Sequence, residues 1–126
     1  MPVKIISAPM APAAVGPYSH AVVANGFVFT AGQVGLVPGT KQLAAGGIRE
    51  QTVQALKNIQ AVLQASGSDL GKVVKTTVFL ANMDDYAAMN EIYAQYFWRN
   101  PPARSAVQVA KLPLGALVEI ETVALV

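Results

Sequence analysis

The fold is decided by residues 19–33, which read SHAVVANGFVFTAGQ. Two runs that favour β-strands, Ser19 to Ala24 and Phe27 to Gln33, are separated only by Asn25-Gly26. This dipeptide accepts the positive φ angles of a two-residue turn and is the strongest short signal for a β-hairpin. The stretch therefore predicts an antiparallel pair of strands.

Irregular segments flank this hairpin. On the N-terminal side Lys4 to Ile6 fits a short strand, and the three prolines between Ala8 and Pro17 predict a stiff loop. On the C-terminal side the glycine-rich segment from Val34 to Gly47 predicts a long connection.

Two helices follow in the sequence. Apolar residues recur at helical spacing from Ile48 to Ala65, and Ser66-Gly67 supplies a stop signal. The β-branched run Val73 to Leu80 predicts a strand, and Asn82 is placed to cap a second helix with two aspartates in its first turn. The apolar stripe of this second helix consists of Tyr86, Met89, Tyr93, Tyr96 and Phe97.

Two further strands, Ser105 to Val109 and Leu117 to Val126, close the chain. The predicted order is β-β-β-α-β-α-β-β. It indicates a two-layer α+β fold with both helices on one face of a mainly antiparallel sheet, in a single domain over residues 1–126. No residues remain to cover the other face of the sheet, so a second subunit is its simplest cover.

The composition also favours an oligomer. Hydrophobic residues make up 53% of the 126 residues, and charged residues only 13%. That charged share is about half the usual one, so a monomer lacks the polar residues to cover itself. We therefore expect large apolar interfaces between subunits.

Several classes of function are disfavoured by the residues present. The chain has no cysteine and one histidine, His20, which excludes disulfides, thiolate metal sites and multi-histidine zinc sites. The nine basic residues are scattered and the net charge is only +2, a poor footprint for nucleic acid. No segment is long and apolar enough for a signal peptide or a membrane span, so we expect a cytoplasmic protein.

The strongest candidate for binding is Arg104. It follows the stiff turn Asn100-Pro101-Pro102 and enters an apolar strand, so its guanidinium is held by rigid backbone. A guanidinium grips a carboxylate with two parallel hydrogen bonds, which a lysine cannot do. The alternative is a surface arginine in an ordinary ion pair.

Three other polar residues are candidates. Glu119 and Glu121 lie two apart on a strand, so both point to one face, either as solvated residues or as carboxylates that position water. Asn90 interrupts the apolar stripe of the second helix, either as a solvent-facing amide or as a site residue. For His20 we prefer a surface or interface position over a catalytic role.

At these residues the chain resembles the reactive intermediate deaminase family, RidA, also called YjgF, from about Ile6 to Ala124. The resemblance is carried by Ala13-Ala14-Val15-Gly16-Pro17-Tyr18-Ser19, Thr30-Ala31-Gly32-Gln33, Val73-Val74-Lys75-Thr76-Thr77-Val78, Met89-Asn90-Glu91-Ile92-Tyr93, Pro102-Ala103-Arg104-Ser105 and Val118-Glu119-Ile120-Glu121. It implies a chorismate-mutase-like fold, a homotrimer whose sheets form a central barrel, and sites at the subunit boundaries. It also implies hydrolysis of 2-enamino and 2-imino acids, such as 2-aminoacrylate and 2-iminopropionate, to 2-keto acids and ammonia without a cofactor.

The resemblance also assigns roles to particular residues. Arg104 matches the arginine that binds the substrate carboxylate, and Tyr18 and Asn90 match residues that line the site. Glu119 matches the glutamate linked to water positioning. The family commonly has Ser-Gly-Gln where this chain has Ala31-Gly32-Gln33, so a hydroxyl is lost. We expect the backbone amides of Ala31 and Gly32 to remain available to substrate.

These residues suffice for an undemanding reaction. An imine beside a carboxylate already hydrolyses in water, so a protein need only orient it, protonate it and direct a water molecule. Two alternatives stay open: a non-catalytic trimer that binds or senses 2-keto acids, and RNA cleavage or translation inhibition, against which the scattered basic residues argue.

Overall fold

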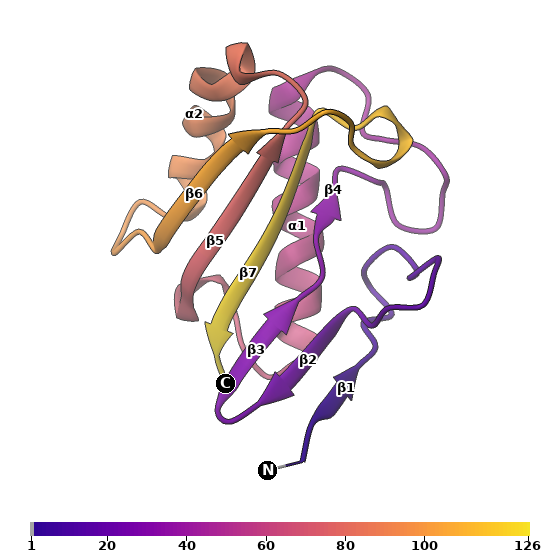
Figure 1. Cartoon of the computed structure of the whole chain (residues 1–126), viewed down its shortest axis with the longest axis vertical. Coiled ribbons are helices and arrows are strands. Elements are labelled where there is room, and N and C mark those ends of the chain that lie inside the picture. The colour runs from indigo at the N-terminus through magenta and orange to yellow at the C-terminus, as the bar shows by residue number, and fades with distance from the viewer. Residues whose placement is uncertain (1) are drawn as a thin grey trace.

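The computed structural model describes residues 2–126. Its elements are β1 (Lys4–Ile6), β2 (Ala21–Ala24), β3 (Phe27–Thr30), β4 (Gln33–Val34), α1 (Ile48–Ala65), β5 (Val73–Leu80), α2 (Tyr86–Tyr96), β6 (Ala103–Gln108) and β7 (Val118–Leu125) (Figure 1). The predicted order is confirmed, with one added short strand, β4. The predicted α+β class is confirmed as well.

The hairpin of β2 and β3 forms as the sequence predicts. Asn25 and Gly26 both have positive φ, at 53° and 82°, and Val22 lies opposite Phe29 in the antiparallel register. Along the sheet the strand order is β1-β2-β3-β7-β5-β6, with β4 also pairing with β7. Only β5 and β6 run parallel, so the sheet is mainly antiparallel.

A β-bulge interrupts the predicted strand from Phe27 to Gln33. Phe29 pairs with Val123, whereas Gln33 pairs with Ile120, so four steps along one strand match three along the other. The extra residue lies in Ala31-Gly32, between β3 and β4. Bulges bend a strand and redirect its neighbours, and this one lies beside β7, which carries Glu119.

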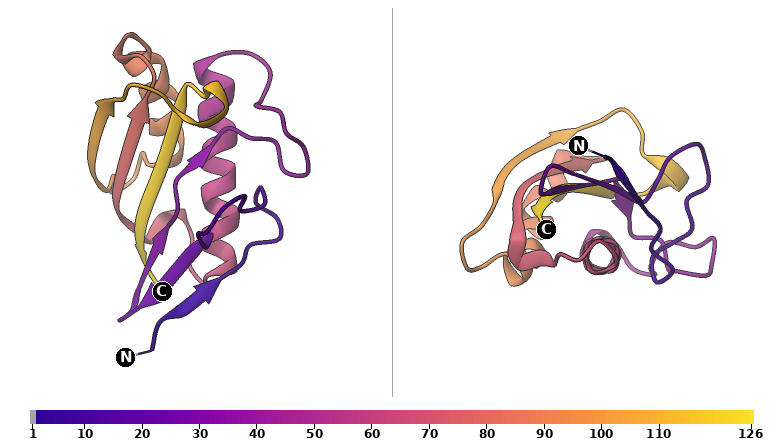
Figure 2. Two further views of the ribbon diagram at one scale, coloured as in Figure 1. Left: turned by 45° about the vertical axis from the view of Figure 1, so that its right-hand side comes forward. Right: turned by 90° about the horizontal axis from the view of Figure 1, so that it is seen from below.

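Both helices lie on one face of the sheet, and the core fills the space between (Figure 2). Leu56, Ile59 and Leu63 on α1 are fully buried, as are Val78 on β5 and Ile120 on β7. The helical stripe predicted from Ile48 to Ala65 therefore packs on the sheet as expected.

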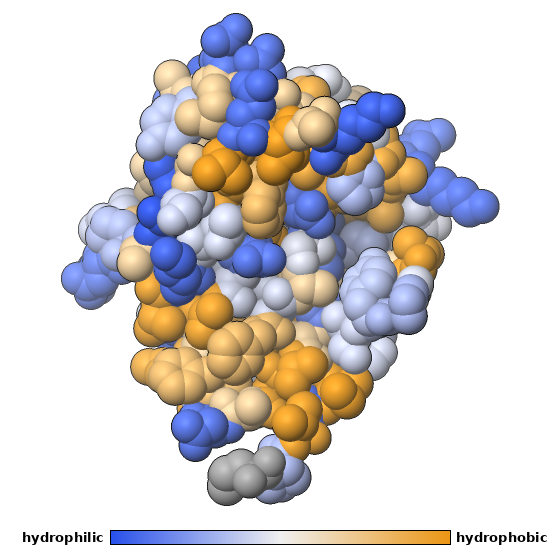
Figure 3. All heavy atoms as spheres, in the orientation of Figure 1, coloured by the Kyte–Doolittle hydropathy of each residue, from blue (hydrophilic) through white to orange (hydrophobic). Residues whose placement is uncertain are grey.

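The other face of the sheet carries exposed apolar side chains (Figure 3). Ile5 is 62% exposed, and Phe29 and Leu125 are 46% and 45% exposed. The sheet is curved but open, with β1 and β6 as its outer strands. A barrel of the kind that the resemblance implies would therefore need further copies of the chain.

Candidate functional site

One group of the predicted site residues meets at the bulge. Tyr18, Ala31, Gly32, Pro113 and Glu119 line an open cleft of about 310 Å³. Glu119 comes from β7, Gly32 from the bulge that pairs with it, and Tyr18 from the end of the N-terminal loop. The sequence missed Pro113, which lies in a turn that shows no chemical signal of its own.

Glu119 packs directly against Gly32. A Cβ atom built on Gly32 would lie only 2.5 Å from Glu119 Oε2, so a larger residue at position 32 must displace the carboxylate. Burial raises the pKa of the Glu119 carboxyl above its usual range, and the nearby charge of Glu121 raises it further. The two glutamates thus share a face, as predicted, and Glu119 is the more buried of the two.

The raised pKa of Glu119 makes stability depend on pH. A carboxyl whose pKa is higher in the folded protein binds its proton more tightly there than in the unfolded chain. The bound proton therefore stabilises the fold at pH values below the ordinary pKa of 4.5, and this stabilisation is lost as the pH rises through the folded pKa. We therefore expect Glu119→Gln to raise the Tm at pH 7 and to leave it unchanged below pH 4.5. Thermal melts over this range measure the effect, and a lower Tm at pH 7 would contradict it.

The backbone of Ala31 differs from the expectation. Its N–H donates to the carbonyl of His20 at 2.9 Å, so this amide is occupied and not available to substrate. The expectation of a free amide was wrong for Ala31. The pairing between β2 and β3 extends one residue further, to His20 and Ala31, before the bulge begins. For Gly32 it stays a prediction.

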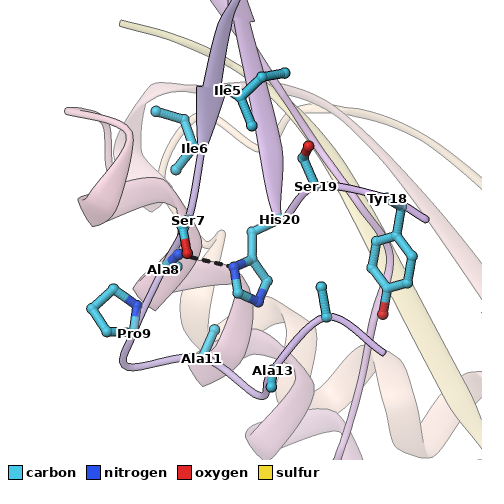
Figure 4. A pocket seen from close by; sticks show the side chains of 11 residues that line it. Ile5, Ile6, Ser7, Ala8, Pro9, Ala11, Ala13, Tyr18, Ser19 and His20 are labelled. Atoms are coloured by element: carbon cyan, nitrogen blue, oxygen red, sulfur yellow. Dashed lines mark hydrogen bonds between the residues drawn. The ribbon is translucent and has the colours of Figure 1, made fainter. Parts of the chain in front are cut away.

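His20 is buried, so the preferred surface or interface position was wrong. Its Nδ1 accepts from the N–H of Ala8 at 2.9 Å, and its Nε2 lies 2.7 Å from the carbonyl oxygen of Pro12. Since Nδ1 accepts, Nε2 carries the proton and donates to Pro12. Figure 4 shows the ring inside the loop from Ala8 to Ala13, with Tyr18 beyond Ala13. His20 thus holds the loop that leads to Tyr18.

Removing this imidazole is expected to loosen the loop. In His20→Ala the buried N–H of Ala8 loses its partner, which costs about 1–3 kcal/mol of folding stability. His20→Gln is the matched control, because an amide also offers one acceptor and one donor. Urea unfolding of the three proteins measures the difference in stability. Equal stability of His20→Ala and the parent protein would refute the role of His20 in holding the loop.

A second group of site residues surrounds Arg104. Its Nη1 donates to Asn90 Oδ1 at 2.7 Å and its Nη2 to the hydroxyl of Tyr86 at 2.8 Å. Its guanidinium carbon lies 4.7 Å from the ring centre of Tyr93 and 5.4 Å from that of Tyr86. Tyr93 is itself fixed by a 2.7 Å hydrogen bond to Thr76. The guanidinium is therefore held by α2, and the sequence missed both tyrosines as its partners.

Arg104 also borders open space. A cleft of about 510 Å³ is lined by Arg104, Asn90, Tyr93, Trp98 and Pro102, among others. Two of the five N–H groups of the guanidinium are used within the chain, so the others remain able to bind an anion. The side chain is half-buried rather than sealed in its own subunit.

The two groups lie on opposite faces of the sheet. Arg104 on β6 lies beside Thr76 on β5, and Thr76 lies beside Thr122 on β7. The side chains of all three residues are on the helix side of the sheet. Glu119 pairs with Phe79 on the other side, and its cleft shares no lining residue with that of Arg104. A single chain therefore brings Tyr18, Ala31, Gly32 and Glu119 together, and separately Arg104 and Asn90.

Comparison with known families identifies the family of the chain. The family model described as "Endoribonuclease L-PSP" matches residues 8–126. The chain belongs to the endoribonuclease L-PSP family. Two of the solved structures that the chain matches carry the names RidA and YjgF. The resemblance found in the sequence is therefore confirmed.

Relatives in the L-PSP family are similar over nearly the whole chain. A protein of Mus musculus named 2-iminobutanoate/2-iminopropanoate deaminase is 53% identical over 121 residues, which cover 96% of this chain and 90% of that protein. RidA from an Antarctic Psychrobacter superposes with a TM-score of 0.93 at 41% identity, covering 98% of this chain and 99% of that one. E. coli TdcF with bound serine gives 0.92 at 39%, with 98% of each chain covered. No helix in the described part of this L-PSP family member is both long and apolar enough to cross a membrane.

Proposed function

We propose that the protein hydrolyses 2-enamino and 2-imino acids, such as 2-aminoacrylate and 2-iminopropanoate, to 2-keto acids and ammonia. The observation that carries the proposal is Arg104, whose guanidinium is fixed by Asn90 and Tyr86 and borders an open cleft. Such a group suits a small carboxylate. The name of the 53% identical mouse relative, a deaminase of two imino acids, supports the same substrate class.

In this proposal each group of residues has its own task. Arg104 binds the substrate carboxylate and Tyr18 closes the cleft. A water molecule adds to the imine carbon while Glu119 accepts its proton. The nitrogen gains one proton as the carbon–nitrogen double bond opens and a second as the added hydroxyl loses its own. The carbon–nitrogen single bond then breaks, and ammonia leaves with the bonding electron pair. The remaining oxygen becomes the keto group, so one water is consumed for each ammonia released.

The proposal requires two subunits at each site. Arg104 and Glu119 lie on opposite faces of one sheet, and the open face carries exposed apolar residues that another copy can cover. A homotrimer would bring Arg104 of one subunit to the far side of the cleft that holds Glu119 of the next, and would close the sheets into a barrel. The mass of the particle in solution, measured by light scattering, tests the trimer.

The reaction is tested with substrate made in place, because these intermediates decay in water. A dehydratase releases 2-aminoacrylate, and the appearance of the 2-keto acid is followed with and without this protein. Faster appearance is the expected result. A non-catalytic sensor of 2-keto acids would instead raise its Tm with added pyruvate and leave the rate unchanged.

The family description names one other reaction, RNA cleavage. The nine basic residues form no run along the chain, which argues against an RNA-binding surface. Saturable cleavage of RNA by highly purified protein, lost in Glu119→Gln, would overturn the deaminase proposal.

The proposal also includes the cellular compartment in which the enzyme acts. Imino acids are short-lived in water, so the enzyme must meet them where they are released. We place it in the cytoplasm, and cell fractionation tests this.

A further inference from the structure

An apolar groove of about 640 Å³ extends from the cleft of Glu119. The groove is lined by Ala13, Val15, Leu36 and Leu114, and all four residues also line a cleft that reaches Tyr18, Gly32 and Glu119. The two spaces are therefore continuous. The walls come from three separate loops: the N-terminal loop, the connection after β4, and the turn at residues 113–115.

Two large apolar side chains of this groove are unusually exposed. Val15 is 87% exposed and Leu114 is 63% exposed. Exposed apolar groups that gather around a hollow, rather than singly, are typical of binding sites. Only Lys41 adds a charge to the lining, and its ammonium can remain in water while its stem covers apolar surface.

Leu114 is also held in a costly backbone conformation. Its φ is 61° and its ψ is 17°, in the left-handed region that bulky residues rarely adopt. Such strain persists where the surrounding structure enforces it, and it concentrates at sites that bind ligands. The left-handed turn is what places the Leu114 side chain on the rim shared by the cleft and the groove.

We propose that this groove binds the aliphatic side chain of the substrate, so that the enzyme prefers imino acids with longer apolar side chains over 2-iminopropanoate. This inference rests on the proposed function, because it assumes that the reacting carbon lies beside Glu119. The side chain of a bound imino acid then points into the groove between Val15 and Leu114. The apolar part of this wall accepts methylene groups.

Each methylene that leaves water is worth about a threefold to fourfold gain in affinity when fully buried. The groove is open on one side, so part of this gain is lost. For 2-iminohexanoate, with three more methylenes than 2-iminopropanoate, we expect a kcat/KM about tenfold higher in the parent protein.

The test compares these two substrates, generated from norleucine and alanine by an amino-acid oxidase. Leu114→Asn keeps a residue that tolerates positive φ but removes the apolar wall. We expect it to lower the ratio of kcat/KM for 2-iminohexanoate over 2-iminopropanoate about tenfold. Val74→Ser is the control, since Val74 is an exposed apolar residue at the start of β5, and its ratio is expected to match that of the parent protein.

Binding of the 2-keto acids separates this inference from the proposed function. Calorimetric dissociation constants for pyruvate and 2-oxohexanoate are measured in the parent protein and in Leu114→Asn. Tighter binding of 2-oxohexanoate that disappears in Leu114→Asn supports the groove even if no imine is hydrolysed. Equal affinities in the parent protein, or a Leu114→Asn protein that changes oligomeric state while keeping its chain-length preference, would overturn it.

Discussion

Replacing Arg104 with Ala is expected to lower kcat/KM for 2-iminopropanoate about 10-fold to 150-fold. A hydrogen-bonded contact to a charged group is worth about 1.5–3 kcal/mol, and each 1.4 kcal/mol corresponds to a factor of about ten. The loss should appear mainly as weaker substrate binding, because in the proposed mechanism the guanidinium binds the carboxylate and takes no part in bond breaking. The measurement is keto-acid appearance at several substrate concentrations.

Two variants make this result specific. Arg104→Lys keeps the charge but lacks the planar fork that contacts Asn90 and Tyr86, so it should recover only a small part of the activity. Arg49→Ala removes another arginine, in an exposed ion pair with Glu91, and should leave the rate unchanged. Full activity of a folded Arg104→Ala protein would reject the carboxylate-binding role.

Mixing two impaired variants is expected to restore part of the activity. If each site takes Arg104 from one subunit and Glu119 from the next, Arg104→Ala and Glu119→Gln each impair every site of a pure oligomer. After the two are unfolded together and refolded at equal amounts, about one site in four joins two intact halves. The mixture should therefore reach about a quarter of the parent activity.

The same experiment contains its own controls. Each variant refolded alone should keep its own low kcat/KM, and a chain carrying both substitutions, mixed with either single variant, should give no recovery. If the mixture of the two single variants is no more active than its components, the two residues do not serve a shared site, and the inter-subunit proposal fails. Recovery cannot arise from a site within one chain, because each chain lacks one of the two groups.

The regular elements could be predicted from the sequence because their signals are local. Asn25-Gly26 specifies its turn from two residues, and the stop at Ser66-Gly67 ends α1 at Ala65 as expected. Asn82 caps as predicted, but it caps a short 3-10 turn, Met83–Asp85, that leads into α2. The bulge at Ala31-Gly32 escaped prediction because it exists only relative to the register of β7, which is distant in the sequence.

The site residues could be predicted less fully, for two physical reasons. The partners of His20 are backbone atoms of Ala8 and Pro12, and backbone atoms leave no trace in residue types. Tyr86, Asn90 and Tyr93 do recur at the spacing of one helix face, which is a usable signal. We assigned the two tyrosines to the apolar core because periodicity alone does not reveal that this face reaches the outer strand β6.

The bulge leaves neighbouring positions with unequal room for redesign. At position 32 any side chain must displace the Glu119 carboxylate, so a substitution there changes the site itself. Position 31 already carries a Cβ, and its peptide is anchored by the carbonyl of His20. An enzyme engineer can therefore introduce a hydroxyl at position 31, as Ala31→Ser, and adjust substrate preference without changing the backbone conformation.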